Sequence, residues 1–161
     1  MAKLLIIYHS RTGGTRQMAE AAAEAAGKET DTLLKRAEDT GPEDLLGADG
    51  YLFAAPENLA ALSGEMKEFF DRCYYPVLGQ IEGRPYALMI CAGSDGEGAA
   101  RQAARIAKGW RLRDVQPPLI VNTSAQTPEE ILAEKTIPES KLEKCRELGA
   151  ALGAGIKMGV F

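Results

Sequence analysis

The residues best suited to chemistry lie at positions 9–15, where the sequence reads HSRTGGT. This segment joins a run of aliphatic residues to an alanine-rich stretch. It carries three hydroxyl side chains and two adjacent glycines: Ser10, Thr12, Thr15, Gly13 and Gly14. The start of a helix offers unpaired backbone N–H groups and about half a positive charge of dipole, and glycines let a ligand approach them closely. The segment therefore predicts an anion-binding loop.

The motif excludes two common classes of phosphate-binding site. It lacks the lysine of a nucleotide-triphosphate loop, G-x-x-x-x-G-K-[ST], and it lacks the G-x-G-x-x-G pattern of dinucleotide sites. A single phosphate is the simplest ligand that remains. The alternative is ordinary helix capping, which would employ one or two of the three hydroxyls. We expect backbone amides to dominate, with the flanking Arg11 and Arg16 mainly solvated.

Two further loops follow apolar segments and precede helical ones. PENLAAL begins at Pro56, and AGSDGEG occupies residues 92–98. In open α/β sheets, ligands bind outside the carboxyl ends of the strands, where the strand order reverses. The second of these loops also imitates a nucleophile elbow around Ser94. A serine hydrolase would need a histidine, and His9, the only one, precedes Ser94 in the chain.

Five apolar segments could position these loops as strands. Three are continuous runs, typical of strands covered on both faces, and two are weaker: 3–8, 50–55 and 86–92, then 30–36 and 118–121. Helical patterns alternate with them at 15–27, 63–75, 97–112 and 139–155. Brief helices are expected at 41–46 and at 127–132, where Thr127 provides a cap before Pro128. The alternation predicts an α/β fold with a parallel sheet and helices on both faces.

Composition excludes several classes of protein. The 161 residues suit a single domain spanning 1–161, and no apolar run is long enough to span a membrane. A net charge of −4 without a basic stripe argues against nucleic acid as a partner. Cys73, Cys91 and Cys145 are widely spaced and form no metal-binding motif, so we expect no metal and reduced thiols in a cytoplasmic protein.

The three loops together resemble those of a known superfamily. S-R-T-G-G-T at 10–15 resembles the phosphate loop [ST]-x-T-G-x-T of flavodoxin-like flavoproteins. PENLAALSGEMKEFFDRCYYP at 56–76 is similar to the second flavin loop of small NAD(P)H-dependent FMN reductases and quinone oxidoreductases. CAGSDGEGAARQ at 91–102 resembles their third loop. The resemblance extends from residue 3 to about 121, and it implies a flavodoxin-like, doubly wound, five-stranded sheet of order 2-1-3-4-5.

The resemblance also implies positions for FMN. The phosphate loop would comprise Ser10, Arg11, Thr12, Gly13, Gly14 and Thr15. The dimethylbenzene and N5 side of the ring would face Pro56, Glu57, Asn58 and Leu59. The N3 and O2 side would meet Gly93, Ser94, Asp95, Gly96 and Gly98. Many relatives carry aromatic residues in the second loop, where this chain has Leu59 and Ala61.

The implied function is that of an FMN-dependent oxidoreductase. NADH or NADPH would reduce the flavin, which would pass electrons to a quinone, a free flavin or another small acceptor. No side chain is nominated as a catalytic acid or base, and Asn58 with nearby amides is the expected partner of N5. The alternatives are a flavodoxin-type electron carrier that meets a redox partner protein, and an interaction protein that has lost durable flavin binding. Relatives often self-associate, which makes a homo-oligomer a further expectation to test.

Overall fold

A computed structural model describes residues 2–161. Its five longer strands are β1 (Lys3–Tyr8), β2 (Asp31–Arg36), β3 (Gly50–Asn58), β5 (Pro85–Ala92) and β7 (Leu119–Asn122), and β4 (Ala61–Leu62) and β6 (Arg113–Asp114) are short. The helices are α1 (Gly14–Gly27), α2 (Pro42–Leu46), α3 (Gly64–Val77), α4 (Glu97–Gly109), α5 (Pro128–Leu132) and α6 (Glu139–Met158), with a 3-10 turn at Ala37–Asp39. No helix within residues 2–161 is long and apolar enough to span a bilayer.

The strand order confirms the flavodoxin-like topology. The sheet runs β2-β1-β3-β5, and β5 then pairs with β6 near its start and with β7 near its end. All these pairings are parallel, with Ile6 opposite Leu52 and Phe53 opposite Leu88. The five longer strands therefore follow the expected order 2-1-3-4-5. The chain reverses its direction of progress across the sheet between β1 and β3, which is where such folds bind ligands.

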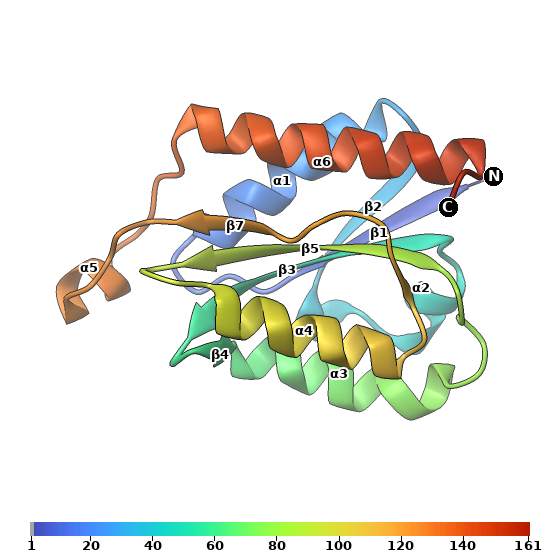
Figure 1. The fold of residues 1–161 in the computed structure, drawn as a ribbon, viewed down its shortest axis with the longest axis horizontal. Helices are drawn as coiled ribbons and strands as arrows, with labels where there is room; N and C mark the ends of the chain where they lie inside the picture. The colour runs from blue at the N-terminus through green and yellow to red at the C-terminus, as the bar shows by residue number, and fades with distance from the viewer. Residues whose placement is uncertain (1) are drawn as a thin grey trace.

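Helices cover both faces of the sheet, with α1 and α6 on one side and α3 and α4 on the other (Figure 1). Alternate residues of each central strand enter opposite cores, because successive side chains of a strand point to opposite faces. Leu4, Ile6 and Leu52 pack toward α1 and α6, whereas Leu5 and Phe53 pack toward α3 and α4. Each such buried side chain contributes roughly 1.5–3 kcal/mol of transfer free energy.

Aromatic residues fill the core beneath α3 and α4. Phe53, Phe69, Phe70 and Trp110 lie with ring centroids 5.0–6.4 Å apart, in tilted or edge arrangements. These residues therefore serve packing. Trp110 follows the end of α4, which is shorter than the expected helix at 97–112 because the chain turns at Arg111, whose φ is 61°.

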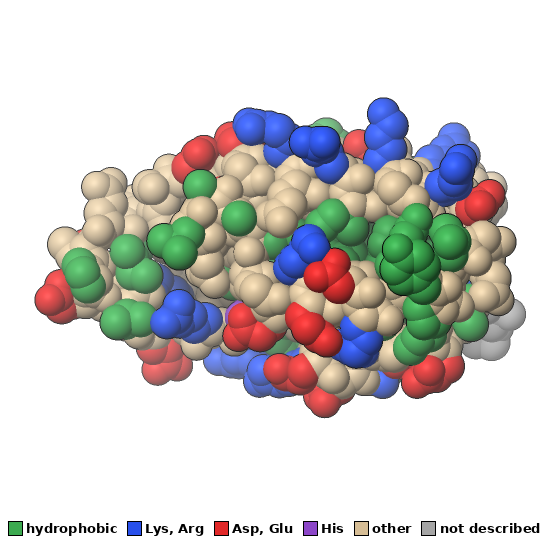
Figure 2. Space-filling model, turned by 90° about the horizontal axis from the view of Figure 1, so that it is seen from below, with side chains coloured by type: hydrophobic (Ala, Val, Ile, Leu, Met, Phe, Trp, Pro, Cys, Tyr) green, Lys and Arg blue, Asp and Glu red, His purple; other side chains and the backbone are tan. Residues whose placement is uncertain are grey.

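The outer surface of α3 and α4 carries a group of hydrophobic side chains (Figure 2). A shallow groove of about 410 Å³ lies there, and its walls include Tyr74, Tyr75 and Ile106. At the other end of the chain, Phe161 folds back against Gly155 of α6, and its ring packs against the core beneath α1 and α6. The C-terminal segment thus covers its own domain, although Met158 and Val160 remain exposed.

The segment after β3 differs from the expected loop. The strand continues through Pro56 to Asn58, turns at Leu59 and Ala60, and returns as β4 in an antiparallel pairing. Leu59 and Ala60 have φ values of 52° and 65°, as a two-residue hairpin turn with the matching twist requires. Tight turns of this type usually contain Asn or Gly, so the leucine and alanine gave no signal of a hairpin.

Candidate functional site

The carboxyl ends of β1, β3, β5 and β7 surround a cavity of about 350 Å³. The structure brings most of the predicted site residues to its walls: Ser10, Arg11, Thr12, Gly14, Thr15, Pro56, Glu57, Asn58, Leu59, Gly93 and Ser94. They come from three loops that are far apart in the sequence. Their convergence is the arrangement expected at the switch point of a doubly wound sheet.

Four predicted residues lie outside the walls of this cavity. Gly13 borders a neighbouring cavity instead. Gly96 and Gly98 pack against protein, since a Cβ atom would lie 2.5 Å from Ile120 Cγ2 at the first position and would overlap the Ala60 carbonyl oxygen at the second. Asp95 accepts a hydrogen bond from the Glu97 N–H at 3.3 Å. Contact between these residues and a flavin stays a prediction.

Several wall residues were not predicted. Cys91 and Ala92 end β5, and Ala60 belongs to the hairpin turn. Thr123, Ala125, Ile131 and Lys135 come from the region after β7. A signal for Thr123 and Ala125 did exist, because they directly follow a predicted strand. Ile131 and Lys135 lie farther along the chain, where no sequence pattern connects them to the first loop.

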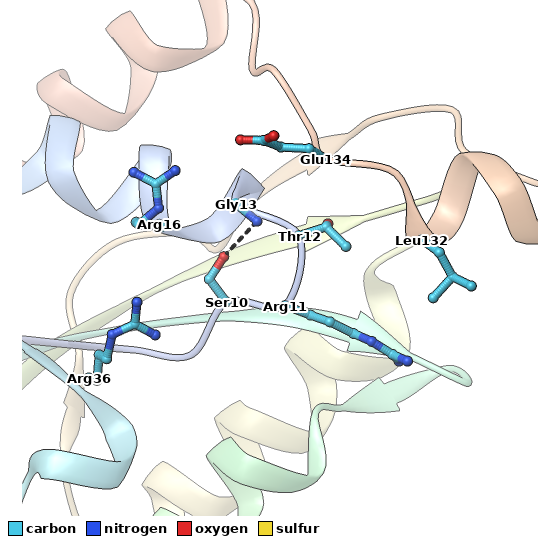
Figure 3. A pocket seen from close by; sticks show the side chains of 8 residues that line it. All are labelled: Ser10, Arg11, Thr12, Gly13, Arg16, Arg36, Leu132 and Glu134. Atoms are coloured by element: carbon cyan, nitrogen blue, oxygen red, sulfur yellow. Dashed lines mark hydrogen bonds between the residues drawn. The ribbon is translucent and has the colours of Figure 1, made fainter.

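The start of α1 is built as the phosphate-loop pattern predicts. Gly13 takes a left-handed conformation, with φ of 92°, directly before the first residue of the helix. The Ser10 hydroxyl accepts a hydrogen bond from the Gly13 N–H at 3.2 Å (Figure 3). Gly14 is packed so closely that a Cβ atom would lie 2.8 Å from Cys91 Sγ. Gly14 and Thr15 line the cavity, and among the described residues no side chain accepts from the N–H groups of this first turn.

Glu57 caps the start of α4. Its carboxylate accepts hydrogen bonds from the Gly96 N–H at 2.8 Å and the Ala99 N–H at 3.0 Å. The negative charge thus satisfies the first turn of α4 and complements its dipole. This contact also fixes the second loop against the third.

His9 connects the first loop to the start of α3. It is buried, its Nδ1 lies 2.8 Å from Ser63 Oγ, and its Nε2 lies 3.1 Å from Glu65 Oε2. Both ring nitrogens therefore have partners at α3. Ser63 is itself completely buried, and His9 does not line the cavity. Ser94 lines the cavity without His9 beside it, which removes the serine-hydrolase alternative.

Cys91 forms part of the cavity wall beneath the first loop. Burial raises the pKa of its thiol to about 11, although the positive charge of Lys135 and a hydrogen bond with Thr15 act in the opposite direction. The thiol stays neutral at physiological pH, and a neutral thiol is a poor nucleophile. Cys91 therefore serves as a small apolar wall residue.

A second cavity, also of about 350 Å³, shares Ser10, Arg11 and Thr12 with the first (Figure 3). Arg16 and Arg36 lie on one side of it, while Arg11 extends away from them. Glu134 also borders this space. Arg16 and Arg36 form ion pairs with Glu20 and Glu38, at 3.3 and 3.6 Å. The acidic partners offset much of the positive charge around this cavity.

Solved structures confirm the fold. An archaeal flavodoxin superposes with a TM-score of 0.78 at 18% identity, covering 96% of this chain and 99% of its own. A WrbA-like flavodoxin from Agrobacterium tumefaciens gives 0.78 at 20% identity, covering 98% and 99%. At such low identity these similarities support the architecture alone.

Curated relatives match over part of their length. A flavodoxin from Aquifex aeolicus (strain VF5) is 38% identical over 100 residues, which cover 61% of this chain and 54% of the relative. An NAD(P)H dehydrogenase (quinone) from Acidithiobacillus ferrooxidans is 33% identical over 94 residues, covering 45% and 47%. The chain thus spans about half the length of the curated relatives it matches.

The family profile described as NADPH-dependent FMN reductase matches residues 42–125. The matched range extends from α2 to the loop after β7, and it includes the hairpin and the start of α4. It therefore contains two of the three loops around the cavity. The chain belongs to the NADPH-dependent FMN reductase family.

Proposed function

We propose that this protein binds FMN in the cavity at the carboxyl edge of its sheet and acts as an oxidoreductase. Electrons would pass from NADH or NADPH through FMN to a small acceptor such as a quinone or free flavin. The observation that carries the proposal is one cavity that joins the first turn of α1, whose N–H groups have no side-chain acceptor among the described residues, to a wall with small apolar residues. Family membership supports the same cofactor.

The phosphate end of FMN fits the first loop. The N–H groups at the start of α1 favour an anion, and the hydroxyls of Ser10, Thr12 and Thr15 stand beside them on the cavity wall. Gly14 lets the start of the helix pack closely against Cys91 at the cavity wall. These residues would bind the phosphate mainly through hydrogen bonds, and they would fix the orientation of the ring.

The ring end fits the remaining walls. Pro56, Ala92 and Ala125 offer small apolar surfaces, and Leu59 and Ile131 stand at the exposed rim. Leu59 is completely exposed, which leaves the hairpin tip free to pack against a flat aromatic ligand. When bound, FMN supplies the two-electron chemistry, and the protein contributes position and electrostatics. Asn58 and backbone amides of the hairpin are the groups we propose beside N5.

A second candidate function is that of a flavodoxin-type electron carrier. The 38% identity to the Aquifex aeolicus flavodoxin favours it. Such a carrier would bind FMN in the same cavity but would exchange electrons with a protein partner. Docking of that kind often uses a large patch of one charge, and the net charge of −4 is small.

Anaerobic reduction separates these functions. The purified protein is loaded with FMN, separated from free flavin and mixed with NADH or NADPH while flavin absorbance is recorded. We expect bleaching within seconds, followed by reoxidation when a quinone is added. Free FMN at the same concentration serves as the control. Flavin that is reduced only by a protein reductase would favour the carrier, and a chain that takes up no FMN at micromolar concentration would refute both functions.

A further inference from the structure

Lys135 occupies an unexpected place beside the first loop. Its ammonium group donates hydrogen bonds to the Ile131 and Ala133 carbonyl oxygens, at 2.9 and 2.6 Å. The same Nζ atom lies 3.4 Å from Thr12 Oγ1. The side chain is partly buried and forms part of the cavity wall together with Ser10 and Thr12. A fixed positive charge therefore lies next to the hydroxyls of the loop.

The backbone around Lys135 is attached to the same loop. The Lys135 N–H donates to the Thr12 carbonyl oxygen at 2.8 Å. Gln17 of α1 adds two bonds, since its Nε2 donates to the Lys135 carbonyl oxygen at 2.7 Å and its Oε1 accepts from the Ile137 N–H at 2.9 Å. These contacts span more than a hundred positions of sequence. They hold the ammonium group in place before any ligand arrives.

The charge of Lys135 also reaches into the cavity. It acts to lower the pKa of the Cys91 thiol, which lines the cavity floor, against the larger effect of burial. Arg11 is the other cation on the cavity wall, but its side chain is exposed and extends away from Arg16 and Arg36 (Figure 3). Lys135 is thus the cation whose position is fixed by hydrogen bonds on both sides.

We propose that Lys135 is the charged phosphate-binding residue of this site and determines its preference for a phosphorylated flavin over riboflavin. This proposal rests on the proposed function, because it takes FMN as the ligand. A phosphate monoester between the start of α1 and Nζ would replace Thr12 as an acceptor while the carbonyl bonds persist. A charge-assisted hydrogen bond of this kind supports roughly a tenfold gain in affinity.

Three variants test the proposal. Lys135→Gln removes the charge but retains a donor for the Ile131 carbonyl, Lys135→Arg retains the charge, and Lys157→Met removes an exposed lysine at the far end of α6. FMN and riboflavin are titrated into each full-length protein and followed by flavin fluorescence. We expect Lys135→Gln to weaken FMN about tenfold and riboflavin less than twofold. Lys135→Arg should retain most of the FMN affinity, and Lys157→Met should match the unmodified chain.

The outcomes separate this proposal from the proposed function. Equal losses for FMN and riboflavin in a folded Lys135→Gln variant, or no loss for either, would overturn the role of Lys135 while FMN binding stands. If the unmodified chain binds neither flavin, the proposed function fails and Lys135 loses its ligand with it. Circular dichroism verifies the fold of each variant. Should Lys135→Gln unfold, Lys135→Met is titrated in its place, and the same selective loss of FMN or equal loss of both flavins decides for or against the proposal.

Discussion

The starts of α1 and α4 have similar local structures but different hydrogen-bond partners. Each helix follows a central strand of the sheet, and each begins after a glycine in the left-handed conformation, Gly13 with φ of 92° and Gly96 with φ of 99°. At α4 the N–H groups of Gly96 and Ala99 donate to the Glu57 carboxylate. At α1 the Gly13 N–H donates to the Ser10 hydroxyl, but within residues 2–161 no side chain accepts from the N–H groups of the first helical turn.

This difference indicates that the start of α4 stabilises the fold, whereas the start of α1 is available to a ligand. Unpaired N–H groups at a helix start require an acceptor, and an anion is the best one. The protein supplies its own anion at α4 and thereby joins the second loop to the third. At α1 the same requirement stays open toward the cavity. The contrast explains why only one of two similar glycine-rich loops is expected to bind phosphate.

The largest effect is expected when α1 receives an internal anion. Ser10→Asp would place a carboxylate near the Gly13 N–H, which Ser10 already contacts. Like-charge repulsion and competition for the same donors should weaken FMN at least about a hundredfold. Ser10→Asn, which is similar in size and neutral, should weaken it only a few fold. Calorimetric titration with FMN provides the measurement, and equal affinities for the two variants would contradict the account.

The reverse change removes the internal anion from α4. Glu57→Ala leaves the Gly96 and Ala99 N–H groups without their acceptor, so the free energy of unfolding should fall by about 2–3 kcal/mol. Urea denaturation without flavin measures this change. Asp95→Ala, which removes one longer and exposed hydrogen bond, is the comparison and should cost under about 1 kcal/mol. Similar stabilities for the two variants would show that Glu57 is not a structural cap.

A smaller effect is expected from the hydroxyl of Thr12. Thr12→Val keeps the shape of the side chain but removes its oxygen from the cavity wall. FMN should bind about tenfold more weakly, whereas riboflavin should bind as before, since it has no phosphate. Fluorescence titration with both ligands checks this. A parallel loss for riboflavin would mean that Thr12 acts on the ring or on the fold.

The smallest effect concerns the glycine at the start of α1. Gly13→Ala should lower the free energy of unfolding by about 1 kcal/mol, because alanine resists a φ of 92°. A Cβ there would meet no atom closer than 3.5 Å, whereas at Gly96 it would lie 2.5 Å from Ile120. Gly96→Ala should therefore cost more, by thermal or urea denaturation. The opposite ranking would indicate that α1 is the tighter of the two starts.

The sequence was sufficient for the architecture because strands and helices here follow strong local patterns. The brief helix α5 shows this best, since Thr127 and Glu130 form the capping box at its start and Pro128 follows at the first helical position. The hairpin was missed because its turn uses Leu59 and Ala60, and Pro56 disfavours a strand. The pairing of β3 with β4 therefore outweighs the conformational preferences of the two turn residues.

Prediction of the site failed where contacts are long-range. The phosphate-loop pattern placed Ser10, Thr12 and Thr15 on the cavity wall, since a strand, a glycine turn and a helix determine their positions locally. The bond from Glu57 to α4 and the approach of Lys135 to Thr12 depend on how distant segments pack. No local spacing encodes such contacts, so a single sequence gave no reason to propose them.

The central claim is that the open start of α1 binds the phosphate of FMN. A crystal structure of the FMN complex tests it most directly. The account predicts phosphate oxygens within about 2.7–3.1 Å of the backbone nitrogens of the first turn of α1. A phosphate bound instead among Arg16 and Arg36, or at the start of α4 with Glu57 displaced, would contradict it.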